Sequence, residues 1–249
     1  LTDAPGRVDE KQLEELGHIG ASYDMYLLDD LKDGLVPEHK INIFLATTMI
    51  TQEERAAIES QLQKNGNILV WIFTDGISDG KTTDIALMES LTGMDLSILS
   101  TQRQRIATAK ISNIDHWLTN GMNLNQPYGV ETYDKLSPLI GITDSTATTL
   151  AYHTGTTKVA MAVKDMGDWT SVYSSIPNLP QGLFQNMLSF AGSHIYTDSP
   201  SDVIYANSDY VALHSIFAGE RTVNLPQRAT VYDVFAGKVI ATDCSSFTV

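Results

Sequence analysis

Hydrophobic and polar positions follow two different rhythms along the chain, and the rhythm changes near residue 102. Before that point, apolar positions at helical spacing alternate with short, continuous apolar runs, which is typical of helices alternating with buried strands. Consecutive parallel strands joined through helices form right-handed crossovers, so this part predicts a parallel sheet covered by helices. The predicted helices lie at 8–20, 51–66 and 82–93, and the predicted strands at 21–31, 41–46 and 67–73.

The later part of the chain is dominated by strand patterns separated by Gly, Asp or Thr turns, which predict antiparallel hairpins at the edge of the sheet. One helix is predicted at 179–192, because five apolar residues share a face and Gly192 follows them. Only short strand patterns come after it, including separate ones at 220–225 and 229–235. The pattern therefore predicts an α/β domain over 1–200, with a mostly parallel sheet flanked by helices, and a small all-β module over 201–249. The other strands expected after residue 102 lie at 103–111, 147–154, 157–165, 169–175, 202–207, 210–216 and 238–242.

Local signals mark the ends of one predicted helix clearly. Thr51 followed by Glu54 is a capping box, in which each residue satisfies a free backbone N–H of the other. Asn65 and Gly66 tolerate the left-handed backbone that ends a helix. The sequence thus predicts a helix between Thr51 and Gly66.

Charge and cysteine content limit the possible partners. The 249 residues include 30 acidic and 16 basic side chains, a net charge of −14 that disfavours nucleic acid and anionic membranes as partners. A single cysteine, Cys244, excludes an internal disulfide and a cysteine-cluster metal site. The location stays open between cytoplasmic and secreted or periplasmic, as for a soluble bacterial-type protein. Because numbering begins at Leu1 rather than Met, we expect a piece of a longer chain.

The loop after the predicted strand 67–73 is the candidate binding site. In doubly wound sheets, ligands bind beyond the carboxyl ends of the strands, which places Thr74, Asp75, Ser78 and Asp79 at such a position. The letters GISDG also spell Gly-x-Ser-x-Gly, so a serine hydrolase using Ser78 is an alternative. That alternative needs a histidine base, for which the sequence offers His116, His153, His194 and His214. An exposed loop serine is the favoured interpretation, because the strand ends before the first glycine.

Other chemical signals are weaker. Asp29 and Asp30 end a predicted strand and are interpreted as a solvated turn rather than a cation site. The letters GKTTD resemble the end of a phosphate-binding loop, but Asp75 occupies the position of the first glycine. No metal and no cofactor are therefore predicted.

Aromatic residues in the second half offer a carbohydrate-binding alternative. Trp117, Trp169 and Tyr196 lie in the segments DHWLTNG, MGDWTSVY and SHIYTD, and aromatic faces stack well on sugars. A contiguous exposed row of the three would favour a carbohydrate-binding module. Their burial would favour a scaffold.

Several blocks of sequence together resemble a known family. LGHIGASYDMYLLDDL, HKINIFLATTMITQEERAAIESQLQKNGNILVWIFTDGISD, DHWLTNGM and GDWTSVYSSIPNLPQGLFQNMLSFAGSHIYTDSP occur in this order and cover much of the chain. They resemble the middle, trimerisation domain of the β-galactosidases of glycoside hydrolase family 42 and of related glycoside-hydrolase-like proteins. The resemblance implies a flavodoxin-like or class I glutamine amidotransferase-like fold.

The resemblance also implies what this chain does not do by itself. Amidotransferases carry an elbow cysteine where this sequence has FTDGIS, and the catalytic glutamates of family 42 lie on a preceding barrel that these residues do not include. We therefore expect no catalytic residue here. The expected function is that of an accessory domain, for oligomerisation or cleft formation, in a β-galactosidase-like protein that acts on carbohydrate. Expected partners are the rest of a larger chain, a second copy, and carbohydrate near the interface.

Overall fold

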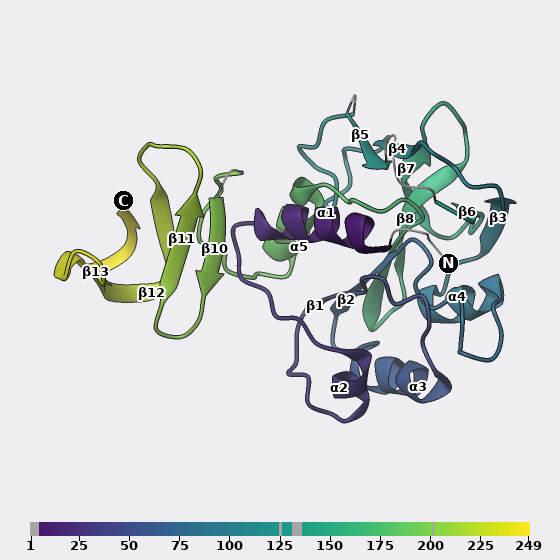
Figure 1. Ribbon diagram of the computed structural model, residues 1–249, viewed down its shortest axis with the longest axis horizontal. Coiled ribbons are helices and arrows are strands. Elements are labelled where there is room, and N and C mark those ends of the chain that lie inside the picture. The colour runs from purple at the N-terminus through teal and green to yellow at the C-terminus, as the bar shows by residue number, and fades with distance from the viewer. Residues whose placement is uncertain (1–4, 125, 131–135, 201) are drawn as a thin grey trace.

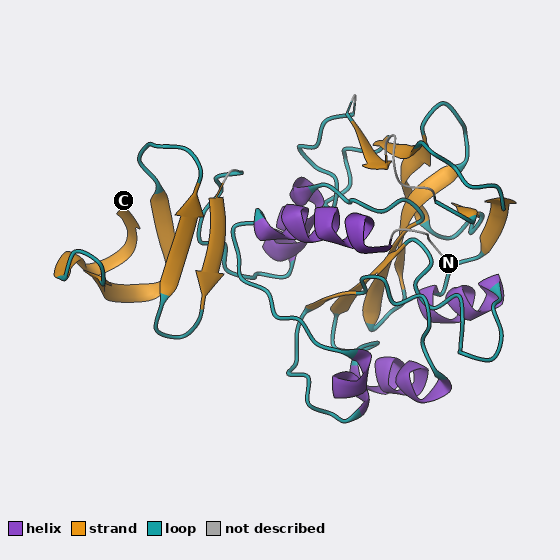
Figure 2. Cartoon of the chain, viewed as in Figure 1, coloured by secondary structure: helices purple, strands orange, loops and turns teal. Residues whose placement is uncertain are grey.

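A mixed β-sheet forms the centre of the protein, and the C-terminal strands lie apart from it (Figures 1 and 2). The computed structural model describes residues 5–124, 126–130, 136–200 and 202–249. Within these ranges, no helix has the length and apolar character needed to cross a membrane. The helices are α1 (Pro5–Gly17), α2 (Leu28–Lys32), α3 (Gln52–Gln61), α4 (Ile85–Thr92) and α5 (Gln181–Phe190).

The helix ends follow the local sequence signals in most places. The capping box of α3 is confirmed, because the Thr51 N–H donates to Glu54 and the Glu54 N–H donates to the Thr51 hydroxyl. Helix α4 begins after Asp84, whose carboxylate accepts from the Ala86 N–H. It ends at Gly93, which has φ +67°. Side-chain caps and a left-handed residue thus set these boundaries.

The strand predicted over 21–31 is wrong. Residues 22–27 have no regular secondary structure, and α2 begins at Leu28. Asp29 and Asp30 therefore lie in the first turn of a helix rather than at the end of a strand. The Asp30 carboxylate accepts from the Leu27 N–H at 2.9 Å, and negative side chains stabilise a helix N-terminus. This local polar chemistry outweighs the extended pattern of the apolar residues.

Nine of the strands belong to the central sheet. Its main path runs β1-β2-β9-β8-β7-β4-β5, while β6 pairs with β8 and β3 pairs with β6. The strands of this sheet are β1 (Ile41–Ile43), β2 (Asn67–Ile72), β3 (Leu96–Ser100), β4 (Ala107–Ile111), β5 (Pro127–Val130), β6 (Leu139–Ile142), β7 (Thr148–His153), β8 (Val159–Asp165) and β9 (Trp169–Ser174).

The expected predominance of parallel strands is not confirmed, because the sheet is mixed. Two pairs are parallel, β1 with β2 and β2 with β9. The other pairs of this sheet are antiparallel. The turns 154–158 and 166–168 are too short for the crossover that a parallel pair requires. The antiparallel pairing predicted for 147–154 and 157–165 is confirmed. Strand β9, however, lies in the interior of the sheet rather than at its edge.

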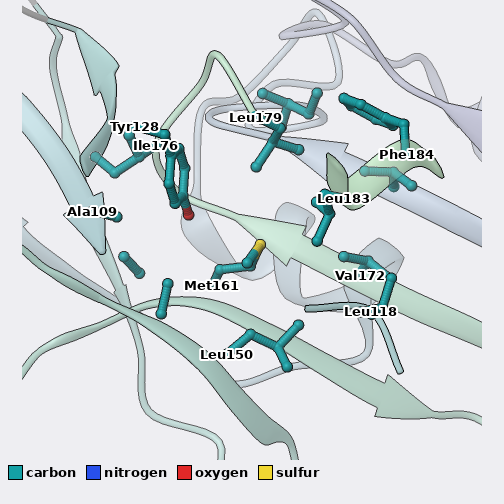
Figure 3. Packing of buried hydrophobic residues seen from close by; sticks show 14 of the residues in the cluster. Ala109, Leu118, Tyr128, Leu150, Met161, Val172, Ile176, Leu179, Leu183 and Phe184 are labelled. Atoms are coloured by element: carbon teal, nitrogen blue, oxygen red, sulfur yellow. The ribbon is translucent and has the colours of Figure 1, made fainter. Parts of the chain in front are cut away.

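Two apolar cores lie on the two faces of the sheet. Along β2, Ile68, Val70 and Ile72 belong to one core, while Leu69 and Trp71 belong to the other. Alternate side chains of a strand point to opposite faces, so β2 is buried along its whole length. Figure 3 shows part of the first core, where Leu183 and Phe184 of α5 lie with Met161 and Val172 of the sheet.

The C-terminal strands form two separate antiparallel pairs: β10 (Asp202–Ala206) with β11 (Val211–Ser215), and β12 (Thr222–Asp233) with β13 (Lys238–Thr248). The two strands predicted at 220–225 and 229–235 are one strand with irregular register, which corrects that prediction. The Asn224 N–H donates to the Tyr196 carbonyl at 2.7 Å, which links β12 to the segment after α5. The division into domains 1–200 and 201–249 stays a prediction.

A partly buried ion pair ties the antiparallel strands to the end of α4. The Lys164 ammonium donates to the Gly93 carbonyl at 2.6 Å and to the Asp144 carboxylate at 2.7 Å. Burial alone would raise the pKa of Asp144, but hydrogen bonds from Lys164 and Thr146 hold it well below its usual range. The ionised carboxylate is thus favoured in the folded state.

We expect Asp144→Asn to lower the free energy of unfolding by about 1.5 to 3 kcal/mol at neutral pH, since a hydrogen-bonded charge is lost. A depressed folded pKa contributes stability above the unfolded pKa, so the difference from wild type should shrink below about pH 4. Urea unfolding across pH measures this. Asp243→Asn, which breaks the exposed pair with Arg228, is the control and should change little. Equal effects of both substitutions would contradict the assignment.

Candidate functional site

The turn after β2 contains a residue in the left-handed conformation, and that residue is apolar. Phe73 has φ +59°, a left-handed conformation that is uncommon for a bulky side chain. Its N–H donates to the Ser174 carbonyl at 2.7 Å, and its carbonyl accepts from the Tyr173 hydroxyl at 2.9 Å. In hydrolases such a strained turn presents the nucleophile. Here it directs Phe73 into the core, and Ser78 lies five positions further along the loop.

Asp75 is a buried structural anchor. One carboxylate oxygen accepts from the Thr47 N–H and hydroxyl, both at 2.8 Å, and the other accepts from the Ile72 N–H at 2.8 Å. Only 1% of Asp75 is exposed, and Thr74 beside it is also buried. The carboxylate therefore joins the loop after β1 to the loop after β2. The binding role expected for this loop stays a prediction.

Arg55 holds the same loop from the other side, and the sequence analysis missed it. Its guanidinium donates to the carbonyls of Ile50, Leu87 and Gly76 at 3.0, 2.7 and 2.5 Å. Burial lowers the pKa of Arg55. One signal existed in the sequence: Arg55 precedes Ile58 by three residues, so it falls on the apolar stripe of α3.

Ser78 and Asp79 are less buried, but their polar groups bond within their own loop. The Ser78 hydroxyl donates to the Thr82 carbonyl at 2.8 Å and accepts from the Gly80 N–H at 3.1 Å. One Asp79 oxygen accepts from the N–H groups of Lys81 and Thr82 at 2.8 and 2.7 Å, and these bonds lower the pKa of Asp79. The pair thus shapes a polar turn.

The histidines that Ser78 would need lie elsewhere in the structure. His116 accepts from the Leu118 N–H, His194 bonds to the Asn224 carbonyl, and His214 lies on β11. None of the hydrogen bonds that the structure records for Ser78, within the described ranges, reaches a histidine. The geometry therefore does not assemble the expected nucleophile and base.

A serine–histidine contact that the sequence did not indicate lies in the core. The Ser175 hydroxyl is 3.2 Å from Nε2 of His153, and both residues are buried. The same Nε2 lies 2.9 Å from the Ile140 carbonyl, which can only accept, so Nε2 carries the proton. A protonated nitrogen cannot accept the serine proton. Burial also lowers the pKa of His153, and the pair is therefore a core hydrogen-bond network.

The aromatic residues do not form an exposed row. Trp169 is 8% exposed and belongs to a core cluster. Trp117 stacks on Phe190 with ring centroids 3.9 Å apart, and Tyr196 packs edge-on against His194. By the criterion set from the sequence, this arrangement favours a scaffold over sugar stacking on these three residues.

Metal ligands do not gather in the part of the chain that the structure describes. Across those residues, no group of three or more His, Cys, Asp or Glu side chains could hold a metal ion. Cys244 lies on β13, where its thiol is 3.6 Å from the Ala229 carbonyl.

Two grooves lie outside the predicted loop, and none of Thr74, Asp75, Ser78 and Asp79 lines either of them. The first, here named the apolar groove, has a volume of about 860 Å³ and runs along residues 21–29 and 39–47, with Phe184 and Leu188 of α5. The second, here named the amide groove, has a volume of about 770 Å³ and lies between α1, α5 and the start of β5. Their walls come from distant segments, which is why sequence spacing did not reveal them.

Neither a family model nor a curated protein matches the chain. Solved structures do match. The β-galactosidase from Bacillus circulans sp. alkalophilus shares 16% identity at a TM-score of 0.65, over 98% of this chain and 36% of that one. The β-galactosidase from Rahnella sp. R3 shares 16% identity at a TM-score of 0.64, over 96% of this chain and 34% of that one. A catalytic mutant of a GH42 β-galactosidase from G. stearothermophilus shares 14% identity at a TM-score of 0.64, over 99% of this chain and 35% of that one.

The chain has the fold of one part of these β-galactosidases. It spans about a third of their length, and at this identity the likeness establishes the fold alone. The family expected from the sequence blocks therefore agrees with the fold. The likeness to glutamine amidotransferases stays a prediction.

We expect Asp75→Asn to lower the free energy of unfolding by about 1 to 3 kcal/mol, because an amide N–H would face backbone donors in a buried position. Asp79→Asn keeps an acceptor oxygen for the turn, so it should lower stability less than Asp75→Asn does. Urea denaturation of both variants provides the comparison. If Asp75→Asn were neutral, Asp75 would not be the anchor of this loop.

Proposed function

We propose that this chain is a non-catalytic accessory unit of a larger β-galactosidase-like protein, serving oligomerisation or forming one wall of a carbohydrate-binding cleft. One observation carries the proposal: the fold matches 96–99% of this chain to about a third of each β-galactosidase described above. The rest of the larger protein would then include a (β/α) barrel that carries the catalytic carboxylates. Carbohydrate would lie near the surface between the two parts.

The apolar groove supports an assembly role. Beside it, residues 22–27 run without regular structure, and Met25 and Leu27 are 68% and 72% exposed. Met49 lines the groove and is also exposed. Contiguous exposed apolar surface on a soluble protein marks an interaction site. This surface lies beside residues 44–47, which follow β1, so it adjoins the edge of the sheet where ligands of related architectures bind.

The bonding of the loop after β2 supports a non-catalytic role. Asp75 and Arg55 use their charged groups to hold the loop, and Ser78 bonds to Thr82 and Gly80. A nucleophile needs a base within hydrogen-bond reach, and the bonds described for Ser78 and His153 do not supply that pairing. The serine hydrolase alternative is therefore disfavoured.

The isolated chain should hydrolyse neither a nitrophenyl β-galactoside nor glutamine, since the hydroxyl of Ser78 and the carboxylate of Asp79 bond within their own loop. Steady-state assays with purified protein measure this, with Ser78→Ala as the matched variant. Turnover by the wild-type chain that Ser78→Ala abolishes would overturn the accessory role.

We expect the chain to self-associate in a concentration-dependent way through the apolar groove. The double substitution Met25→Glu and Leu27→Glu should shift the equilibrium to monomer, because it places charges on the apolar contact surface. Sedimentation velocity measures the change. Ile106→Glu, at an exposed apolar residue that does not line the groove, is the control. A wild-type chain that stays monomeric throughout would remove the oligomerisation role.

A further inference from the structure

The amide groove differs in chemistry from every other site described above. Seven of the residues that line it are Asn or Gln, and its charged lining residues are Lys11 and Glu15, which balance each other. Its walls come from α1, the first half of α5, residues 120–123 and the start of β5. In Figure 1, α1 and α5 lie side by side, and residue contacts between them confirm this. A neutral surface rich in carboxamides is thus assembled from distant parts of the chain.

The walls are fixed by specific hydrogen bonds. Gln181 donates to the His18 carbonyl at 2.5 Å, and its own N–H donates to the Glu15 carboxylate at 2.9 Å. Asn186 donates to the carbonyls of Leu118 and Asn120 at 2.9 and 3.0 Å. These bonds join α5 to α1 on one side and to the loop 120–123 on the other. The groove is therefore pre-formed, as binding sites usually are.

One residue that lines the groove, Asn178, has a left-handed backbone and a buried side chain. Asn178 has φ +59° and is 5% exposed, and its side-chain amide donates to the Gly129 carbonyl at 3.1 Å. Its buried Oδ1 has no hydrogen-bond partner among the described residues. An unsatisfied buried polar atom costs free energy, so the unpaired Oδ1 of Asn178 marks this segment as unusual for a core.

Close packing fixes the backbone around Asn178 and its partner Gly129. Gly129 has φ +127°, and a Cβ atom there would lie 2.4 Å from the Ala107 carbonyl oxygen, so only glycine fits. Below it, Tyr128, Ile176 and Leu179 belong to the core (Figure 3). Gln12 adds a bidentate contact, since its amide bonds to both the N–H and the carbonyl of Leu179. The segment that carries Asn178 is thus anchored on both sides.

We propose that the amide groove binds an uncharged polyhydroxy ligand of mono- or disaccharide size. A carboxamide offers both donors and an acceptor, which matches a hydroxyl group that donates and accepts at once. The balanced lining and the net charge of −14 disfavour an anionic ligand. A volume of about 770 Å³ is in the range of small-molecule sites. This site is distinct from the apolar groove, and it does not depend on the accessory role.

Two lining residues give a clean test, because they do not build the walls. Among the described residues, the side chains of Asn120 and Gln185 make no hydrogen bond, so Asn120→Ala and Gln185→Ala should preserve the fold. Gln52→Ala, at an exposed glutamine on α3 outside the groove, is the matched control. Glucose, galactose and cellobiose are the neutral probes, and glucuronate is the anionic comparison.

Backbone amide NMR titration of the 249-residue chain should show saturable shifts at 120–123, 126–130 and 181–186 with the neutral sugars. The dissociation constant should be on the order of millimolar. Each groove substitution should weaken binding by about three- to tenfold, as expected for one lost hydrogen bond, while Gln52→Ala leaves it unchanged.

Three results would overturn the proposal. The first is the absence of saturable groove shifts with every neutral sugar near its solubility limit. The second is binding that neither Asn120→Ala nor Gln185→Ala weakens. The third is tighter binding of glucuronate than of the neutral sugars, which would identify an anion site around Lys11 instead.

Discussion

The pairing of β2 with β9 is the contact on which the rest of the structure depends. Strand β9 pairs with β2 in parallel over six residue pairs and with β8 in antiparallel, so it joins the helix-rich first part to the hairpins of the second. Both cores extend across these strands, with Val172 in one and Tyr173 in the other. Two hydrogen bonds continue this contact past the end of β2. The Phe73 N–H donates to the Ser174 carbonyl, and the Tyr173 hydroxyl donates to the Phe73 carbonyl. The loops that follow β2 and β9 are positioned as a consequence.

The sequence predicted the elements whose signals are local. The apolar run of β2, the capping box of α3 and the Gly93 stop of α4 each depend on neighbours in sequence, and each is confirmed. Strand β9 was misplaced at an edge because pairing with β2 is a contact between residues about a hundred positions apart. The antiparallel pairs β3–β6 and β4–β7 were not foreseen for the same reason, because their strands are far apart in the sequence, whereas the hairpin of β7 and β8 was predicted. Helix α2 was missed because the apolar pattern does not show the bond by which the Asp30 carboxylate caps its first turn.

The position of the candidate loop could be predicted from the sequence, but the roles of its side chains could not. The loop 74–79 lies beyond the end of β2, as expected, yet a literal Gly-x-Ser-x-Gly does not reveal that the strained turn belongs to Phe73. The spacing of residues also could not show that the charged groups of Asp75 and Arg55 form hydrogen bonds with backbone groups. The amide groove escaped notice because its residues come from several segments and carry no motif.

The fold, the apolar groove and the bonding of the loop after β2 support the proposed accessory role, in which the chain would contribute surface rather than chemistry. Residues 22–27 have no regular secondary structure, and they expose apolar side chains. Exposed apolar surface costs free energy unless another surface covers it. The amide groove adds a second surface of opposite polarity on the other side of α5, since Phe184 and Leu188 line one groove and Gln185 and Asn186 line the other.

Hydrogen exchange tests the central claim most directly. The backbone amides of residues 22–28 would be compared between the natural protein, purified from its source, and the isolated 249-residue chain held dilute. If the apolar groove packs on a neighbouring domain or subunit, these amides should exchange much more slowly in the natural protein, because burial removes them from water. Equal exchange in both samples would contradict the accessory role.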